Sequence, residues 1–381
     1  MAKRLVIIGA GTGGLMAANF VARDLNREIT RGDVSVTLLD ERDAYTYQPG
    51  FLYVAFDLMR PAQIVRPIDE LLAPGVRFVR DRAVRVATDT RRVELAHGEA
   101  LPYDYLVIAT GSHLNMDEVP GLQEGSHWFY TMEGALRLRE ALRDFQGGRL
   151  VVAVGVPHKC PVAPLEFTMM FEEWARQRGI REQSEIIYTY PLGRSHSIQA
   201  VADWATPELE KRGVRVETFF NIESVEPERK VVHSLEGTDF DYDVLVTIPP
   251  HRGEELGAAS GLADSGRWYP TDRYRLQLEG SENIFVLGDA TNLPVSKAGS
   301  VAHFEAEVLA DNLVGLLSEG SPPGYRYNGR AFCFIETGLE RATFISFDYQ
   351  NPPTVPGPTA AVHWFKQTYN RIHWANLKAV M

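Results

Sequence analysis

The sequence predicts an α/β fold with two parallel-sheet units, the second inserted into the first, and a C-terminal region of strands and one amphipathic helix. An apolar strand at residues 4–8 leads through a glycine-rich turn into a helix, and a similar pattern starts again at residue 150. A strand and helix over 283–317 then resemble a return to the first unit. The length of 381 residues also exceeds the roughly 250–300 residues that one hydrophobic core usually spans.

The first unit opens with a βαβ segment. Its helix runs to about residue 25, and alternation at 34–40 predicts a second strand that ends in the acid Asp40. The next stretch of about 25 residues, from Asp43, is rich in aromatics and fits a long functional loop better than a regular element. The remaining strands of this unit are expected as short runs within 75–95 and as a buried strand at 105–111.

The second unit repeats the alternation of strand and helix. Its expected elements are a strand at 150–154, a helix at 164–178, a strand at 185–190 and a helix at 200–212. Alternation within 325–350 then suits strands, and the tail from Thr359 is helical. The expected domains are residues 1–115 with 282–320, residues 116–281, and a C-terminal region of residues 321–381.

Composition narrows the function. Thirty-nine Lys and Arg against fifty Asp and Glu give a net charge of −11, which opposes nucleic-acid binding. We see no apolar run of the roughly 18 residues that a membrane span needs. A strand that starts at residue 4 leaves no room for a signal peptide. Two cysteines are too few for a disulfide scaffold. Together these features predict a cytoplasmic protein with no nucleic-acid partner. We also expect no metal site.

The turn after the first strand carries a dinucleotide motif. Gly9, Gly11 and Gly14 complete G-x-G-x-x-G between strand and helix, where they permit a tight turn, close approach of a pyrophosphate and close helix packing. Asp40 is placed to accept hydrogen bonds from a ribose. The alternative is a helix-packing glycine cluster with a surface aspartate.

Two later strand ends indicate that the dinucleotide at this site is FAD and not NAD. They are Ala109-Thr110-Gly111 and Gly288-Asp289, separated by a long connection. An aspartate such as Asp289 at a strand end can hold ribityl hydroxyls, although it could equally cap a helix. With these motifs the chain resembles the flavoproteins that have tandem Rossmann-like FAD/NAD(P)-binding domains. The resemblance implies a flavin across the first domain, contacted by Gly288 and Asp289.

The second unit departs from a second dinucleotide motif. Gly155 keeps the first glycine, but Pro157 and Cys160 replace the other two, so we expect that NAD(P)H is not the electron donor. Cys160 instead stands beside His158 and Lys159, whose charges would favour its thiolate.

The segment Cys160 to Glu166, Cys-Pro-x-x-Pro-x-Glu, together with Cys333, resembles sulfide:quinone oxidoreductases and flavocytochrome c sulfide dehydrogenase flavoproteins. The resemblance implies a redox disulfide between Cys160 and Cys333, and an acid/base role for Glu166. Spacing alone would equally suit two unrelated core cysteines and a solvated glutamate.

The same resemblance assigns further residues around the flavin and the quinone. It places Lys297 by the flavin pyrimidine, with the helix start at Gly299 offering N–H groups, and Phe334 and Phe365 around a quinone ring. The alternative for Lys297 is a surface lysine before a helix. Many relatives have a third cysteine where this chain has residues 130–134, so we expect the FAD to be non-covalent. His196 is only a weak match to a site histidine, because a surface loop histidine fits equally well.

The tail suggests a membrane surface. Residues 354–381 contain no acid. They do contain three basic residues, Lys366, Arg371 and Lys378, and helically spaced apolar residues, Val362, Phe365, Tyr369 and Ile372, with Trp364 and Trp374 nearby. Such a basic, aromatic helix is typical of peripheral (monotopic) membrane binding. A helix that packs on the core or on a second subunit is the alternative.

The resulting hypothesis is FAD-dependent oxidation of sulfide, or a related sulfur donor, through Cys160 and Cys333, with electrons passed to a membrane quinone. The protein would sit on the cell membrane, on its cytoplasmic face, and a homo-oligomer stays open. One rival is a type II NADH:quinone oxidoreductase, against which the missing second glycine motif counts. Another is a flavin-bearing carrier or sensor that binds persulfide without turnover.

Overall fold

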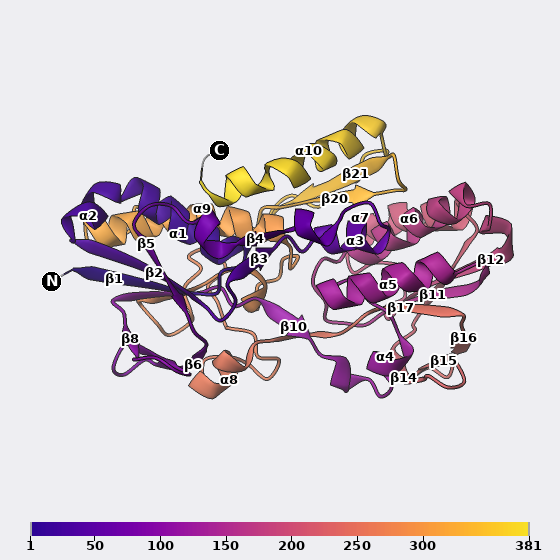
Figure 1. Cartoon of the computed structure of the whole chain (residues 1–381), viewed down its shortest axis with the longest axis horizontal. Helices are drawn as coiled ribbons and strands as arrows, with labels where there is room; N and C mark the ends of the chain where they lie inside the picture. Colours follow the sequence, from indigo (N-terminus) through magenta and orange to yellow (C-terminus); the bar gives the residue numbers. More distant parts are fainter. Residues whose placement is uncertain (1, 380–381) are drawn as a thin grey trace.

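The computed structural model describes residues 2–379 and contains two parallel sheets flanked by helices (Figure 1). The first sheet has five parallel strands in the order β19-β9-β1-β2-β5. These strands are β1 (Lys3–Ile8), β2 (Val34–Asp40), β5 (Val76–Arg80), β9 (Tyr105–Ile108) and β19 (Ile284–Val286). Helix α1 (Thr12–Asp24) packs against α9 (Gly299–Ser318), so a late segment completes the first unit.

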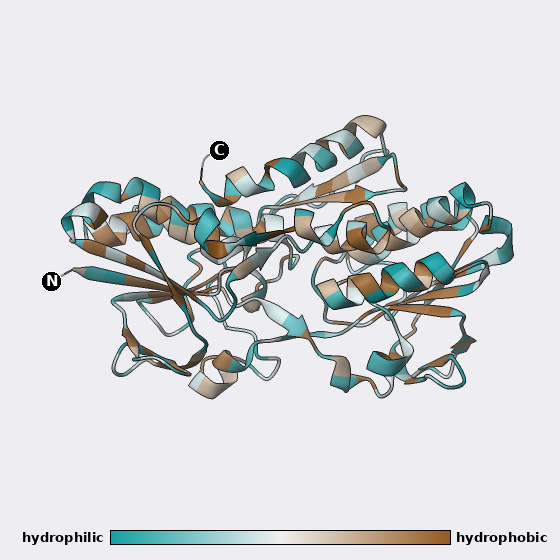
Figure 2. Ribbon diagram, viewed as in Figure 1, coloured by the Kyte–Doolittle hydropathy of each residue, from teal (hydrophilic) through white to brown (hydrophobic). Residues whose placement is uncertain are grey.

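The second sheet has four parallel strands in the order β13-β12-β11-β17. Its strands are β11 (Gly148–Val154), β12 (Ser184–Tyr190), β13 (Val214–Thr218) and β17 (Val244–Ile248). Its helices are α5 (Met132–Asp144), α6 (Ala163–Gln177) and α7 (Gln199–Lys211). The strands of both sheets are mostly hydrophobic (Figure 2), as strands buried on both faces must be. The predicted α/β fold with two Rossmann-like parallel sheets is confirmed.

The chain passes from one unit to the other and back, and the strands of these two connections pair with each other. Strand β10 (Ser112–Leu114) forms an antiparallel ladder with β18 (His251–Gly253). Smaller elements complete the fold: β3 (Ala44–Thr46) with β4 (Val65–Pro67); β6 (Ala83–Ala87), β7 (Arg92–Leu95) and β8 (Leu101–Pro102); β14 (Ile222–Glu226), β15 (Val231–Ser234) and β16 (Asp239–Asp241); and helices α2 (Asn26–Arg31), α4 (Leu122–Gly125) and α8 (Glu255–Ser260).

One sequence prediction about the first unit is confirmed and another is wrong. The first helix ends at Asp24, within one residue of the expected end, and a separate helix, α2, follows it. The aromatic stretch from Asp43 is not a loop without regular structure, because it holds β3, β4 and helix α3 (Gly50–Ala55), all of whose side chains are buried. Aromatic side chains in this stretch pack on distant elements, which local sequence patterns do not reveal.

The C-terminal region crosses back over the first unit toward the second. A hairpin of β20 (Ala331–Glu336) and β21 (Ala342–Phe347) lies under helix α10 (Ala360–Leu377), which forms one edge of the molecule (Figure 1). Strand β20 contacts both α6 of the second unit and α9 of the first. Cysteine- and carboxylate-bearing elements from all three regions are therefore brought together.

Candidate functional site

The turn after β1 fits the pyrophosphate of a dinucleotide. Gly9 has a φ of 101°, and a side chain there would overlap the carbonyl of Ala109. A side chain at Gly14 would overlap the carbonyl of Gly9. At Gly11 an added Cβ would have nothing within 4 Å. Packing therefore requires the first and third glycines, while the second leaves room for a ligand at the N-terminus of α1.

Asp40 ends β2 beside this turn and is buried. Its Oδ2 accepts from Ala10 N at 2.7 Å, and its Oδ1 accepts from Arg42 N and Nε at 2.9 and 3.0 Å. Burial favours the neutral acid, but Arg42 and the backbone donors outweigh it and hold the pKa of Asp40 below its usual value. A ribose that binds this carboxylate would have to replace the Arg42 guanidinium, which is 62% exposed.

Unpaired polar atoms mark the rest of the predicted flavin site. Thr110, after β9, has a buried hydroxyl without a hydrogen-bond partner among the described residues, and so has Ser300 at the start of α9. Gly111 has a φ of 74° and an added Cβ would meet nothing within 4 Å. Buried hydroxyls seldom lack partners. Donors and acceptors of this kind beside an open glycine fit the ribityl and pyrophosphate oxygens of FAD.

The second predicted strand end, at Gly288, is tied to Lys297. The Lys297 ammonium donates to the carbonyls of Asp289 at 3.1 Å and Thr291 at 2.6 Å, and lies 3.9 Å from the centre of the Trp268 ring. It is therefore partly buried in the site and not a surface lysine. Burial lowers the pKa of Lys297, with Asp289 acting in the opposite direction.

Glu305 is a residue of this strand end that the sequence did not single out. It is fully buried on α9, where Oε2 accepts from Gly288 N at 2.5 Å and Oε1 has no hydrogen-bond partner within residues 2–379. Burial raises the pKa of Glu305 to about 8. An acid inside an apolar helix pattern is the only signal that could have found it.

The two cysteines come from different elements and share one buried pocket. Cys160 follows β11 in a left-handed conformation, with a φ of 53°, and its N–H donates to the Lys297 carbonyl at 2.7 Å. Cys333 lies in β20 and is buried, and both thiols are free. Burial, then Glu166 and Cys333, raise the pKa of Cys160, and burial raises the pKa of Cys333 to about 12.

The expectation that the charge of His158 favours the Cys160 thiolate is wrong, whereas Lys159 does interact with Cys160. Burial lowers the pKa of His158 to about 4, so its ring is neutral near pH 7. Burial also lowers the pKa of Lys159. The cation that favours the thiolates is Lys366, which reaches the pocket from α10 and acts against burial at both cysteines.

Glu166 is buried beside the cysteines and is not a solvated helix residue. Its Oε1 accepts from Glu336 N at 2.8 Å and pairs with the Lys366 ammonium. Burial raises the pKa of Glu166, and Lys366 opposes this. The pair joins α6 of the second unit to α10, across 200 residues of sequence.

The outer face of α10 reverses the usual pattern of an amphipathic helix. The helix buries polar residues, including Lys366, Asn370 and His373, and exposes Trp364 at 66% and Phe365 at 69%. The sequence suggested that Lys366 lies on a basic outward face of the helix. This prediction is wrong, because Lys366 is buried. No helix within residues 2–379 is long and apolar enough to cross a membrane.

The two predicted quinone residues are not seen as a ring pair. Phe334 of β20 faces Tyr369 of α10, with ring centres 6.2 Å apart. Phe365 lies one helical turn before Tyr369 and is exposed. A ring inserted between Phe334 and Phe365 would therefore also meet Tyr369, which the sequence analysis did not assign to the quinone.

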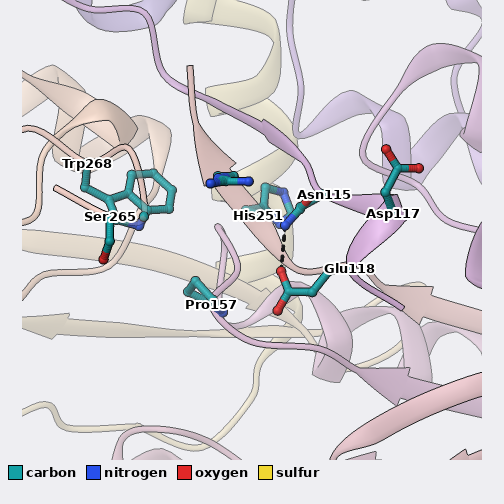
Figure 3. Close-up of a pocket in the computed structure, with 9 residues that line it drawn as sticks. Asn115, Asp117, Glu118, Pro157, His251, Ser265 and Trp268 are labelled. Carbon is teal, nitrogen blue, oxygen red and sulfur yellow. Dashed lines mark hydrogen bonds between the residues drawn. The ribbon is translucent and has the colours of Figure 1, made fainter. Parts of the chain in front are cut away.

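A cavity of about 500 Å³ opens on the other side of the Cys160 loop (Figure 3). It is lined by Asn115, Asp117, Glu118, Pro157, His251, Arg252, Ser265, Gly266 and Trp268. Pro157 connects it to the Cys160 loop and Trp268 to Lys297. Its position offers a small polar substrate a route toward this side of the site.

Two further sequence predictions concern residues near this loop. Tyr130, which stands where relatives have a third cysteine, is buried and donates to the Lys159 carbonyl at 3.2 Å. His196 is fully buried and stacks on Tyr190, so it is not a surface loop histidine. Burial lowers the pKa of His196 to about 4.

Comparison with known proteins identifies the family of the chain and several relatives. Residues 3–306 match the family model of pyridine nucleotide-disulphide oxidoreductases. The chain is 27% identical over 389 residues to the mitochondrial sulfide:quinone oxidoreductase of Mus musculus, covering 99% of this chain and 84% of the mouse protein.

Solved structures share the fold over the whole chain. The sulfide:quinone oxidoreductase of Aquifex aeolicus superposes with a TM-score of 0.86 at 24% identity, covering 100% of this chain and 92% of that one. The NDH2 of Plasmodium falciparum in complex with NADH superposes less well, with a TM-score of 0.73 at 14% identity, over 100% and 98% of the two chains.

Proposed function

Because the chain belongs to the pyridine nucleotide-disulphide oxidoreductase family, we propose that it is an FAD-dependent enzyme that oxidises sulfide through Cys160 and Cys333 and passes the electrons to a membrane quinone. The observation that carries this proposal is that the partly buried Cys160 and the buried Cys333, from different elements, both interact with Glu166 and Lys366, which form a buried ion pair. The two cysteines are far apart in sequence. The backbone N–H of Cys160 donates to the carbonyl of Lys297, which belongs to the predicted flavin site.

The chain offers a complete set of FAD contacts. The Gly9–Gly14 turn and the N-terminus of α1 would hold the pyrophosphate, and Asp40 the adenosine ribose. Thr110 and Asp289 would contact the pyrophosphate and ribityl oxygens. Lys297 would supply positive charge to the flavin ring. Since Tyr130 replaces the third cysteine of relatives, the FAD is proposed to be non-covalent.

The sulfur chemistry uses the cysteine pair in its oxidised form. Hydrosulfide attacks one sulfur of the Cys160–Cys333 disulfide, the S–S bond breaks, and a persulfide and a thiolate are formed. Lys366 stabilises that thiolate, and Glu166 accepts the remaining S–H proton. Bound FAD supplies the two-electron step between the sulfur and the quinone.

The acceptor side is assigned to α10. Trp364, Phe365 and Ile372 point outward from a helix whose polar residues are buried. Exposed aromatic side chains of this kind favour the headgroup layer of a bilayer. A quinone held near Phe334, Tyr369 and Phe365 would then enter directly from the membrane. The mouse and Aquifex relatives are named for quinones, in agreement with this assignment.

The rival NADH-dependent function is disfavoured by the turn after β11. Its amide at Cys160, where the motif has its third glycine, already donates to the carbonyl of Lys297 at 2.7 Å, and the ring of Pro157 occupies the position of the second glycine. In a dinucleotide-binding turn that second position has no side chain, so the backbone can approach the pyrophosphate. This region therefore offers NADH little of the binding that the first turn offers FAD.

Anaerobic mixing of the FAD-loaded protein with sulfide or with NADH tests the proposal. Sulfide should bleach the flavin absorption rapidly, NADH at micromolar concentration should not, and a soluble quinone should restore the colour. Rapid stoichiometric bleaching by NADH would favour the type II NADH:quinone oxidoreductase. Sulfide uptake with no electron transfer to quinone would favour the persulfide carrier.

A further inference from the structure

A sealed cluster of charged groups lies between the cysteine pocket and the outer face of α10. Its members come from four elements: Tyr53 of α3, Glu166 of α6, Glu336 of β20, and His363, Lys366 and Gln367 of α10. The Glu166 and Lys366 side chains are 7% and 9% exposed, and that of Glu336 is fully buried. The proposed sulfur chemistry uses only Glu166 and Lys366.

The charges of this cluster do not balance unless it holds one proton. Two carboxylates and one ammonium leave one negative charge, and an uncompensated charge is costly in a buried site. Burial is the largest influence on the pKa of both Glu166 and Lys366. It raises the pKa of Glu166, and Lys366 opposes this rise. The pKa of Lys366 is also raised, because Glu166, Tyr53 and Glu336 together outweigh burial.

The hydrogen bonds form a path with an inner and an outer end. Lys366 Nζ pairs with Glu166 and lies 4.0 Å from Glu336 Oε1, so a movement of about 1 Å would bring it to hydrogen-bonding distance. Tyr53 donates to the same Oε1 at 2.7 Å. The second oxygen of Glu336, Oε2, lies 2.9 Å from His363 Nδ1.

His363 is the outlet of this path. Its side chain is 15% exposed and lies on the same helix face as Lys366 and Asn370, while its ring centre is 6.1 Å from that of the exposed Trp364. An imidazole that contacts a buried carboxylate through one nitrogen, and has another nitrogen available, can pass a proton by exchanging it between the two.

We propose that Glu336 and His363 carry the proton released at the cysteine pocket from Glu166 and Lys366 to the quinone on the outer face of α10. This inference rests on the proposed function. Oxidation of hydrosulfide to persulfide sulfur at the zero-valent level releases one proton and two electrons. Reduction of a quinone to the quinol takes up two electrons and two protons, so the path supplies one proton and solvent the other.

Few other titratable side chains face the path, and they come from the elements packed around it. They are Cys160 and Cys333 at the inner end, Tyr53 on α3, and Tyr47, whose charge interacts with Lys366. Burial raises the pKa of both tyrosines, so neither is ionised near pH 7 and neither competes for the proton. Lys366 acts to keep the thiolate formed from the disulfide charged.

The test uses the full-length FAD enzyme with two variants, His363→Ala and Glu336→Gln. The control is His233→Gln, which removes a histidine that bridges two carboxylates, Glu226 and Asp239, in the distant β14–β16 sheet. Stopped-flow mixing measures flavin bleaching by sulfide in one turnover, and steady-state assays measure decylubiquinone reduction, each with and without added imidazole.

His363→Ala should lower quinone turnover about 100-fold, the lower end of the range for loss of a proton-transfer group, while single-turnover bleaching by sulfide stays within about twofold. Imidazole should restore turnover in His363→Ala but not in Glu336→Gln, and His233→Gln should match the wild type. Wild-type turnover in His363→Ala, or a loss that imidazole does not restore, would overturn the relay alone. Failure of sulfide to bleach the wild-type flavin would instead overturn the proposed function.

Discussion

Replacing Lys366 by methionine should destabilise the folded protein by about 3–5 kcal/mol near pH 8, the range for breaking a buried ion pair. In the wild type the ammonium pairs with Glu166 in a site where both side chains are less than a tenth exposed. Methionine fills most of the same volume but supplies no charge. Glu166 would keep only its bond from Glu336 N, at 2.8 Å, which cannot offset the cost of a buried carboxylate.

The penalty should depend on pH with a definite sign. Burial raises the pKa of Glu166 and Lys366 opposes that rise, so its removal raises the pKa further. A carboxyl whose folded pKa lies above the unfolded value of about 4.3 stabilises the fold fully below that value, and the stabilisation is lost as pH rises through the folded pKa. Lys366→Met should therefore be least harmful near pH 5 and most harmful near pH 8.

Thermal unfolding of the FAD-loaded protein measures this penalty. At about 2 °C per kcal/mol for a chain of this size, the melting temperature of Lys366→Met should fall by about 6–10 °C near pH 8. Lys378→Met, at the exposed end of the same helix, is the matched control and should change little. Adding Glu166→Gln should restore part of the loss, because it removes the buried charge. A shift below about 1 °C at both pH values would refute the ion-pair reasoning.

Three other predictions follow from the site. Cys160→Ser and Cys333→Ser should each abolish sulfide turnover, and the double variant should be little worse than either, since paired groups are non-additive; additive partial losses in steady-state assays would mean separate structural thiols. Acid or heat should release all the flavin into the supernatant, and colour that stays with the precipitate would require a covalent bond. Trp364→Ser with Phe365→Ser should reduce sedimentation with liposomes and quinone turnover but not flavin bleaching by sulfide; unchanged sedimentation would assign this face of α10 to another contact.

Point substitutions on α10 test membrane docking more cleanly than deletion of the tail. A chain that ends before residue 359 would lose Lys366 and His363 as well as the exposed aromatics. Glu166 and Glu336 would then be left without their cation, and the cysteine pocket would change together with the membrane face. Loss of activity in such a truncation would not identify which contact mattered.

The glycine turn and the sheets were predictable because their signals are local. The apolar runs of β1 and β11 repeat at strand period, and Gly9 and Gly14 are required where a strand meets a helix closely. The start of α9 at Gly299 agrees with the prediction for the same reason. The aromatic stretch around α3 was misjudged because its residues are ordered by contacts with distant helices, as in the bond from Tyr47 to Asn370.

The sequence by itself determined the two Rossmann-like units, the glycine turn of the first and the absence of a second glycine motif, since each depends on neighbouring residues and on backbone geometry. Only the tertiary structure decided the electrostatics of the cysteine pocket. His158 and Lys159 adjoin Cys160 in sequence, but burial leaves His158 neutral and lowers the pKa of Lys159, while Lys366 acts on the Cys160 thiol from 206 residues away. An ion pair is set by distance and desolvation in the folded chain, and neither quantity is encoded in the spacing of residues along it.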